Sequence, residues 1–484
     1  MEVATTMLIS LIISISALLA AALYFITTKI NHSSINLPPG SLGWPLLGET
    51  LEYLRAAQDG KPERPVEKRM DEHKSPPVFK TWVLGEPIAV FCGPKGNKFL
   101  FSNENKLVAQ WWPTPMQRLF GSCLLTAVGD EAKRMRRMLM TFLNPDALLR
   151  YITTMDVVTH HHITTHWQGK EEVKVYPTMK LYTFELACRL FMSMEDPQHI
   201  SRIAAQFNVF LKGFTEFPIS FPGTRFYRAM KAASAIRKEL QVIATHKRAA
   251  LEQGIVSPSQ DLFSHLLATS DENGRFLTEE EIVNNILMLL FAGHDTSSSV
   301  ITLVMKYLGE LPQVYEKVLT EQLHIASSKG HGELLQLEDI QKMSYSWNVV
   351  SEVMRISPPV IGGFRESLVD FTYAGYTIPK GWKLHWNAAS THKDPSLFPS
   401  KDEFDASRFE GSGPAPFSYV PFGGGPRMCL GKEFARLEIL VFLHNVVKRF
   451  KWDLLIPDEK IGYDPIAAPA KGLPIRLQPR ESKA

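Results

Sequence analysis

The ten-residue stretch Phe422-Gly-Gly-Gly-Pro-Arg-Met-Cys-Leu-Gly431 lies directly before a helix-forming run that begins at Lys432. It sets one cysteine, Cys429, among glycines and two residues after Arg427. A helix N-terminus stabilises a thiolate through its unpaired N–H groups, and glycines let the backbone approach a flat macrocycle closely. The residues alone therefore predict a single-thiolate axial site for haem iron.

Two other readings of this cysteine are an ordinary buried thiol in a glycine-rich turn and a zinc ligand. Zinc is disfavoured because the chain has no C-x-x-C pair, and its other cysteines are scattered at Cys92, Cys123 and Cys188. The whole pattern F-x-x-G-x-R-x-C-x-G resembles the haem loop of the cytochrome P-450 superfamily of haem-thiolate monooxygenases. The resemblance covers nearly the whole chain from Leu37 onward. It implies the P-450 fold, haem b held by Cys429 with Phe422 and Gly431 in its loop, and the use of O2 with NADPH-derived electrons.

The N-terminus predicts a membrane anchor. Val3 to Thr28 contains 26 residues and no charge, and as a helix it would span about 39 Å, enough to cross a hydrocarbon core of about 30 Å. A cleaved signal peptide is disfavoured because the stretch is long and Glu2 precedes it. Lys29 follows it, which places the body in the cytosol. We expect an anchor over residues 1–30, a proline-rich hinge over 31–44 and a catalytic domain over 45–484, on a single-pass protein of the endoplasmic reticulum.

Composition narrows the function classes. With 484 residues and 45% hydrophobic content the chain can bury a large core, and a net charge of +3 gives no reason to expect nucleic-acid binding. Four scattered cysteines suit a reducing compartment. We expect a protein that is monomeric in the membrane.

Most of the body is predicted to be helical, with small sheets. Helical spacing runs from Tyr227 to Gly254, and the longest helix is predicted to start at the capping box Thr278-Glu-Glu-Glu281 and to end near Leu311. Short runs of β-forming residues predict strands, at Val78–Val83, Ile88–Phe91, Phe371–Ile378 and Leu473–Leu477.

Inside the longest predicted helix lies Ala292-Gly-His-Asp-Thr296. Alone, this is compatible with a helix distorted around a solvated threonine. It resembles the oxygen-binding A-G-x-D-T segment of the superfamily, which implies that Thr296 and Asp295 deliver protons to bound oxygen. Gly293 leaves room where oxygen must sit.

A second set of residues is expected to hold the fold around the haem. Glu352 and Arg355 stand three residues apart, and Arg408 follows in Phe404-Asp-Ala-Ser-Arg-Phe409. The resemblance implies that these three charges form a buried triad, which is tolerable only while all partners are present. Ala406 replaces a proline that is frequent in the superfamily.

The two carboxylates of haem need cations, and matching by position nominates Arg427, Arg365 and Arg136. The superfamily commonly has Trp or His four residues before the last of these, where this chain has Ala132. Solvated surface arginines are the alternative. A further basic group is expected to dock the NADPH-dependent flavoprotein reductase, the partner that the resemblance implies; it consists of Lys133, Arg134, Arg137, Lys432 and Arg436.

Several stretches resemble plant triterpenoid oxidases, among them the β-amyrin 28-oxidases and the dammarane-type hydroxylases; they are residues 96–107, 111–113, 343–348, 379–383 and 470–474. Leu430 departs from these relatives, which usually have proline there. The resemblance implies oxidation of an apolar triterpene of the β-amyrin type at carbon 28, repeated up to the carboxylic acid, with carbon 16, other ring positions or another terpenoid or sterol as alternatives. An apolar pocket is expected, lined by Trp111, Trp112, Leu289, Ala292, Val360, Ile361 and Phe364.

Two other activities fit a haem-thiolate fold. A hydroperoxide isomerase or dehydratase is disfavoured because it needs no proton relay, and Asp295 and Thr296 are both present. A non-catalytic haem sensor or electron carrier is disfavoured by the same pair.

Overall fold

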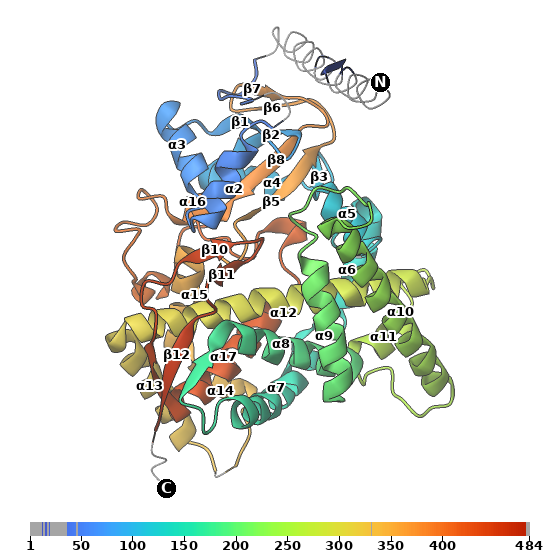
Figure 1. Ribbon diagram of the computed structural model, residues 1–484, viewed down its shortest axis with the longest axis vertical. Helices are drawn as coiled ribbons and strands as arrows, with labels where there is room; N and C mark the ends of the chain where they lie inside the picture. The colour runs from blue at the N-terminus through green and yellow to red at the C-terminus, as the bar shows by residue number, and fades with distance from the viewer. Residues whose placement is uncertain are drawn as a thin grey trace, which may run out of the picture.

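The computed structural model describes residues 36–44, 47–330 and 332–480, and positions 12, 15, 16 and 19 near the N-terminus. The predicted membrane anchor and the first residues of the predicted hinge therefore lie outside the described residues, apart from those four positions. Within the described part, helices dominate and small sheets gather at one end and along one side (Figure 1).

The helices are α2 (Thr50–Gln58), α3 (Arg64–Glu72), α4 (Gly93–Ser102), α5 (Thr114–Phe120), α6 (Gly129–Met140), α7 (Pro145–His166), α8 (Val175–Met192), α9 (Pro197–Leu211), α10 (Arg225–Glu252), α11 (Leu262–Ala268), α12 (Glu279–Glu310), α13 (Pro312–Ser327), α14 (Leu337–Lys342), α15 (Ser344–Ile356), α16 (Ala388–His392) and α17 (Lys432–Arg449). Two 3₁₀ turns accompany them, η1 (Ala406–Phe409) and η2 (Gly425–Arg427).

The strands are β1 (Val78–Val83), β2 (Glu86–Phe91), β3 (Val108–Gln110), β4 (Glu172–Lys174), β5 (Gly362–Ser367), β6 (Phe371–Tyr373), β7 (Tyr376–Ile378), β8 (Lys383–Asn387), β9 (Phe450–Leu454), β10 (Ile461–Tyr463), β11 (Ala467–Pro469) and β12 (Pro474–Pro479). The largest sheet has the order β1-β2-β8-β5-β3, with β2 and β8 parallel and its other pairs antiparallel. A three-stranded sheet has the order β4-β12-β9, and two hairpins, β6-β7 and β10-β11, complete the set.

The helix α12 crosses the middle of the molecule and organises the core (Figure 1). It packs against α8, α10, α15 and α17, and its apolar residues belong to the largest hydrophobic cluster. The capping box at Thr278 is present, with the Glu281 N–H donating to its hydroxyl and its own N–H donating to the Glu281 carboxylate. In the described part of the chain α12 is long and apolar enough to cross a membrane, but it is mostly buried as a core helix.

The described end of the predicted hinge is tied to the large sheet. The N–H of Lys80 donates to the carbonyl of Pro39 at 2.7 Å, and the N–H of Thr377 donates to the carbonyl of Asn36 at 2.8 Å. At Gly40, where φ is +121°, a Cβ would meet the carbonyl oxygen of Lys80 at 2.2 Å. The chain therefore joins the folded body from Asn36 onward.

Candidate active site

The cysteine loop joins η2 to the start of α17. Its backbone is fixed by the N–H of Cys429, which donates to the carbonyl of Phe422 at 2.9 Å. Gly425 has φ +65°, and a Cβ there would meet the carbonyl oxygen of Phe101 at 2.4 Å, so only glycine fits. At Gly431 no atom lies within 4 Å of a Cβ position, which leaves the space beside the cysteine open.

The side chain of Cys429 is exposed, although protein surrounds its thiol. The side chain is exposed, yet burial raises the pKa of its thiol, and the N–H of Gly431 and the charge of Arg136 oppose this shift. A side chain that is exposed although its thiol is surrounded by protein faces an internal space. Such a thiol stays protonated when free and becomes a thiolate when a metal replaces its proton.

Three predicted haem-binding arginines lie near this space, and a carboxylate that sequence reasoning missed holds two of them. Glu104 accepts from Arg365 Nε at 2.5 Å and faces Arg427 Nε at 3.3 Å. Arg427 also donates to the carbonyls of Leu124 and Ala127. Burial lowers the pKa of all three arginines, and Arg365 and Arg136 both add to the effect on Arg427.

The charge balance of this cluster fits haem. Arg365 and Arg427 share one side-chain carboxylate, Glu104, and no carboxylate is among the causes that shift the pKa of Arg136. Among the described residues, three guanidinium groups thus have one carboxylate between them, which leaves two positive charges without a carboxylate partner. Haem carries two propionate carboxylates, and buried cations need such partners. Together with the open thiol of Cys429, the residues present fit the group that the sequence predicts.

The segment Ala292–Thr296 lies within an unbroken α12. Thr296 Oγ1 donates to the carbonyl of Ala292 at 2.7 Å, one turn earlier. Asp295 is buried and its Oδ1 lies 3.0 Å from Nζ of Lys180 on α8, a cation that sequence reasoning also missed. This contact is an ion pair without hydrogen-bond alignment, since Oδ1 has no hydrogen-bond donor within the described residues. Asp295 is thus held toward the partly exposed Lys180.

The structure brings the predicted charge triad together. Arg355 and Glu352 are fully buried and share two hydrogen bonds, from Nε at 2.7 Å and from an Nη at 2.8 Å. Arg408 Nε lies 3.5 Å from the same carboxylate, and the N–H of Asp405 donates to it at 3.0 Å. The η1 turn is capped by the side chain of Asp405, which accepts from the N–H of Ser407. This cap orders the turn in which Ala406 stands.

The residues predicted to line the substrate pocket divide between two regions. Leu289, Ala292 and Ile361 belong to the large cluster around α12, whereas Phe364 packs on the sheet beside β1 and β2. Trp111 meets the ring of Phe364 edge-on at 5.7 Å. Trp112 has a buried indole N–H without a partner in the described part of the chain, and Val360 is half-buried.

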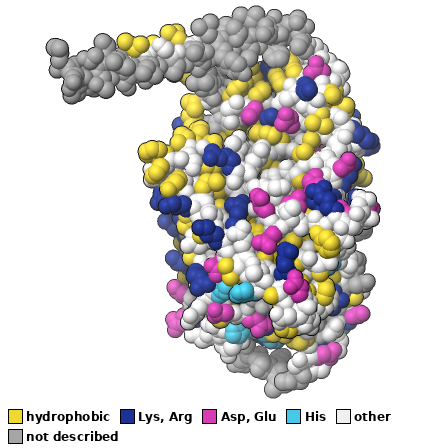
Figure 2. All heavy atoms as spheres, turned by 90° about the vertical axis from the view of Figure 1, so that its right-hand side faces the viewer, with side chains coloured by type: hydrophobic (Ala, Val, Ile, Leu, Met, Phe, Trp, Pro, Cys, Tyr) yellow, Lys and Arg dark blue, Asp and Glu magenta, His cyan; other side chains and the backbone are white. Residues whose placement is uncertain are grey.

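For one residue of the predicted docking group, Arg134 on α6, the prediction of a surface cation is wrong. Arg134 is buried, and it binds Glu131 at 2.5 Å and Glu281 at 3.3 Å, so it ties α6 to the start of α12. Arg137 pairs with Glu272 at 2.7 Å. Basic and acidic side chains are interspersed over the face in Figure 2, which α6 and α10 border. Neutralised pairs of this kind do not build a single-sign field.

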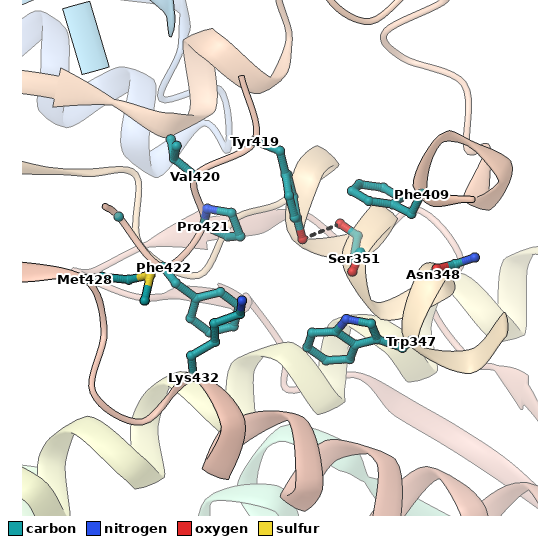
Figure 3. A pocket seen from close by; sticks show the side chains of 11 residues that line it. Trp347, Asn348, Ser351, Phe409, Tyr419, Val420, Pro421, Phe422, Met428 and Lys432 are labelled. Atoms are coloured by element: carbon teal, nitrogen blue, oxygen red, sulfur yellow. Dashed lines mark hydrogen bonds between the residues drawn. The ribbon is translucent and has the colours of Figure 1, made fainter. Parts of the chain in front are cut away.

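A cavity of about 280 Å³ lies beside the cysteine loop. Its walls come from α15, the loop before the cysteine and the start of α17, and they include Trp347, Tyr419, Phe422, Met428 and Lys432 (Figure 3). The hydroxyl of Tyr419 donates to the carbonyl of Ser351 at 3.0 Å and fixes one wall (Figure 3). Arg436 covers the ring of Trp347 at 5.7 Å.

Comparisons with known proteins agree with this geometry. The cytochrome P450 family model matches residues 38–466. A β-amyrin 28-monooxygenase of Solanum lycopersicum is 55% identical over 447 residues, 92% of this chain and 94% of that protein. A β-amyrin 28-monooxygenase of Vitis vinifera is 52% identical, with 98% of each chain covered.

Among solved structures, a cyanobacterial cytochrome P450 with bound retinoic acid superposes with a TM-score of 0.82 and 34% identity, over 92% of this chain and all of that chain. A match of this extent shows that the two chains share one fold over 92% of this chain. The open thiol, the uncompensated arginines and the sequence matches lead to one assignment: this chain belongs to the cytochrome P450 family of haem-dependent monooxygenases.

Proposed function

We propose that this monooxygenase oxidises β-amyrin or a closely related pentacyclic triterpene at carbon 28, and that repeated oxidation at this carbon gives the carboxylic acid. The observation that carries the proposal is the 52% to 55% identity, over more than nine-tenths of the chain, to proteins named β-amyrin 28-monooxygenases. Apolar and aromatic side chains at the predicted pocket positions suit a rigid hydrocarbon skeleton with one hydroxyl group.

The site residues receive the following roles. Cys429 binds the haem iron as a thiolate, and Arg136, Arg365 and Arg427 hold the propionates. The haem, once bound, supplies oxygen activation. The protein's own part is to exclude water, to hold the substrate and to move protons: Asp295 takes a proton from the Lys180 side of α12 and Thr296 Oγ1 presents it.

The triad of Glu352, Arg355 and Arg408 is a structural device in this proposal. It supports the loop that leads from η1 to Cys429. Pocket residues decide which carbon of the substrate lies nearest the iron, so Leu289, Ala292, Val360, Ile361 and Phe364, with the two tryptophans Trp111 and Trp112, are proposed to set the position of oxidation.

We also propose that the protein is a monomer in the endoplasmic reticulum membrane, with residues 1–30 as a single-pass anchor, 31–44 as a hinge and 45–484 as the cytosolic domain. The loop between α9 and α10 exposes Phe217, Ile219 and Phe221, and Trp44 is also exposed. Hydrophobic side chains gather over the upper part of the face in Figure 2. Such side chains favour a lipid surface. Electrons come from NADPH through a flavoprotein reductase in the same membrane.

The test is turnover of β-amyrin in microsomes that contain the protein, a plant reductase and NADPH, with products identified by mass spectrometry and NMR. The expected products carry an alcohol, an aldehyde and an acid at carbon 28, and they require O2. The matched control is Cys429→Ser, which should lose the red-shifted carbon monoxide spectrum and all product. Oxidation at another carbon, or none with a fully haem-loaded protein, would overturn the proposed substrate and position.

A further inference from the structure

A cation without a carboxylate partner lies where α5, α10 and α12 meet (Figure 1). Nε of Arg237 on α10 donates to Oδ1 of Asn284 on α12 at 2.7 Å, and its Nη2 donates to the carbonyl of Leu119 on α5 at 2.5 Å. Burial lowers the pKa of Arg237, and among carboxylates only Glu280 opposes this shift, without forming an ion pair within the described residues. A guanidinium group out of water is costly when it has no counter-charge, so a tie between helices does not by itself explain a charged residue here.

Both side chains of this pair keep hydrogen-bond donors to spare. A guanidinium group carries five N–H donors, and only two of those of Arg237 have acceptors within the described residues. Asn284 is 1% exposed, and no residue in the described part of the chain accepts from its Nδ2. Gly121 follows α5 and leaves space beside this amide, because a Cβ there would lie 2.9 Å from Nδ2. The pair therefore offers several N–H groups to an oxygen atom that the chain itself does not supply.

The pair lies at a fixed distance from the oxygen-binding segment. Asn284 precedes Ala292 by eight residues on α12, which corresponds to about 12 Å along the helix axis. Aromatic rings border this interval: the ring of Phe291 lies 5.3 Å from that of Phe120 on α5 and 4.9 Å from that of Phe214, which follows α9. The surroundings between the polar pair and the oxygen-binding segment are therefore apolar.

This spacing suits an alcohol with a long rigid skeleton. In β-amyrin the hydroxyl group on carbon 3 and carbon 28 lie near opposite ends of five fused rings, so fixing one end fixes the other. A hydroxyl group both accepts and donates hydrogen bonds. Its oxygen can accept from Arg237 or from Nδ2 of Asn284, and its hydrogen can be donated to the Leu119 carbonyl, which has a second lone pair. Without such partners, a hydroxyl group buried among aromatic rings would be unsatisfied.

We propose that Arg237 and Asn284 form a subsite that binds the carbon-3 hydroxyl group of the triterpene and thereby directs the opposite end of the skeleton, with carbon 28, toward the oxygen-binding segment of α12. This inference rests on the proposed substrate and adds the residues that recognise it. Neither residue touches the reacting carbon, so both are positioning residues. The subsite selects alcohols over hydrocarbons of the same shape, because leaving its buried donors unpaired costs binding free energy.

The test compares two ligands that differ only in this hydroxyl group: β-amyrin and olean-12-ene, the same skeleton with hydrogen in its place. Each is titrated into the haem-loaded full chain, and the dissociation constant is read from the shift of the haem absorption band. Wild type should bind β-amyrin about 10- to 100-fold more tightly than olean-12-ene, the range of a hydrogen bond to a charged group. In Arg237→Met and in Asn284→Leu this ratio should fall several-fold, while the affinity for olean-12-ene changes little.

Arg228→Met is the matched control, since it removes an exposed cation from the same helix, and it should leave the ratio at its wild-type value. The ratio separates recognition from a structural role, because a loosened contact between α5, α10 and α12 weakens the binding of both ligands alike. Equal losses of affinity for both ligands in Arg237→Met and Asn284→Leu would overturn the subsite.

The comparison of the two ligands in wild type needs no variant, so it decides even where Arg237→Met fails to retain haem. A wild type that oxidises β-amyrin at carbon 28 and yet binds olean-12-ene as tightly would overturn the subsite and leave the proposed function in place. A wild type that binds neither ligand would overturn the proposed substrate and the subsite with it.

Discussion

At the scale of single residues, Glu104 is the carboxylate that pairs with two of the arginines proposed to hold the haem. Its side chain is almost fully buried between Arg365 and Arg427. The change Glu104→Gln leaves buried guanidinium groups without a counter-charge, which typically costs about 3–5 kcal/mol. We expect a loss of that size in the free energy of unfolding, measured by denaturant titration. The control Glu171→Gln changes an exposed carboxylate and should shift stability by no more than about 0.5 kcal/mol. Equal effects of the two changes would contradict this role.

Lys180 is the other residue that only the structure reveals. Its ammonium group holds Asp295 at 3.0 Å and lies 5.7 Å from the ring of Tyr176. In Lys180→Met the carboxylate loses its cation, and product formed per NADPH should fall by up to about 10²-fold, the lower end of what a positioned general acid contributes. Lys180→Arg should keep most of the coupling. The carbon monoxide spectrum checks that haem binding is intact, and unchanged coupling in Lys180→Met would rule out this part of the relay.

At the scale of elements, the bounds of helices and strands that depend on neighbouring residues could be predicted from the sequence. The capping box predicted the start of the longest helix at Thr278, and the helix runs over Glu279–Glu310 because its first-turn N–H groups are satisfied there. Strand β1 has the predicted bounds, Val78–Val83. Gly293 did not break α12, since packing on both sides outweighs a helix propensity loss of about 1 kcal/mol.

Contacts between distant elements could not be predicted in this way. Glu104 and Arg365 are 261 positions apart, and the sequence around each residue does not predict that they form an ion pair. In the sequence Arg134 stands among other basic residues, a pattern that predicts a surface cation. The fold instead buries it against Glu281 at the start of α12. Helical periodicity gives the face of a helix, but it does not say which partner that face meets.

The triad that joins α15 to η1 gives a prediction at this scale. Arg355 makes two short hydrogen bonds to Glu352 and is fully buried, whereas Arg408 approaches at 3.5 Å and is partly exposed. Arg355→Met should cost about 3–5 kcal/mol of stability and most haem retention, because Glu352 is left as a buried charge. Arg408→Met should cost clearly less. Denaturant titration and the carbon monoxide spectrum measure both, and the reverse order would show that Arg408 is the main counter-charge.

At the scale of the whole molecule, several histidines are buried in the interior, both among the helices and in the large sheet. Burial lowers the pKa of His162 and His392 to about 3 and of His294 and His385 to about 4. The N–H of Val420 donates to Nε2 of His392 at 2.8 Å, a contact that requires this nitrogen to be unprotonated. The core therefore depends on keeping its histidines uncharged.

Stability should consequently fall in mild acid. Below a pH of about 6.5 the histidines become protonated in the unfolded chain but stay neutral in the folded protein. Each buried histidine therefore lowers the free energy of unfolding by up to about 1.4 kcal/mol per pH unit, until the pH reaches its pKa in the folded protein. Glu438 on α17, whose pKa burial raises to about 8, acts in the opposite sense: it stabilises the fold fully below its unfolded pKa of about 4.5 and loses this contribution as pH rises through 8. Thermal unfolding midpoints measured from mildly acidic to mildly alkaline pH should thus pass through a maximum near neutrality. In Glu438→Gln the fall of the unfolding midpoint above neutral pH should become smaller, while the fall below a pH of about 6.5 should remain. A wild-type midpoint that does not fall in mild acid would contradict the conclusion that the buried histidines are neutral.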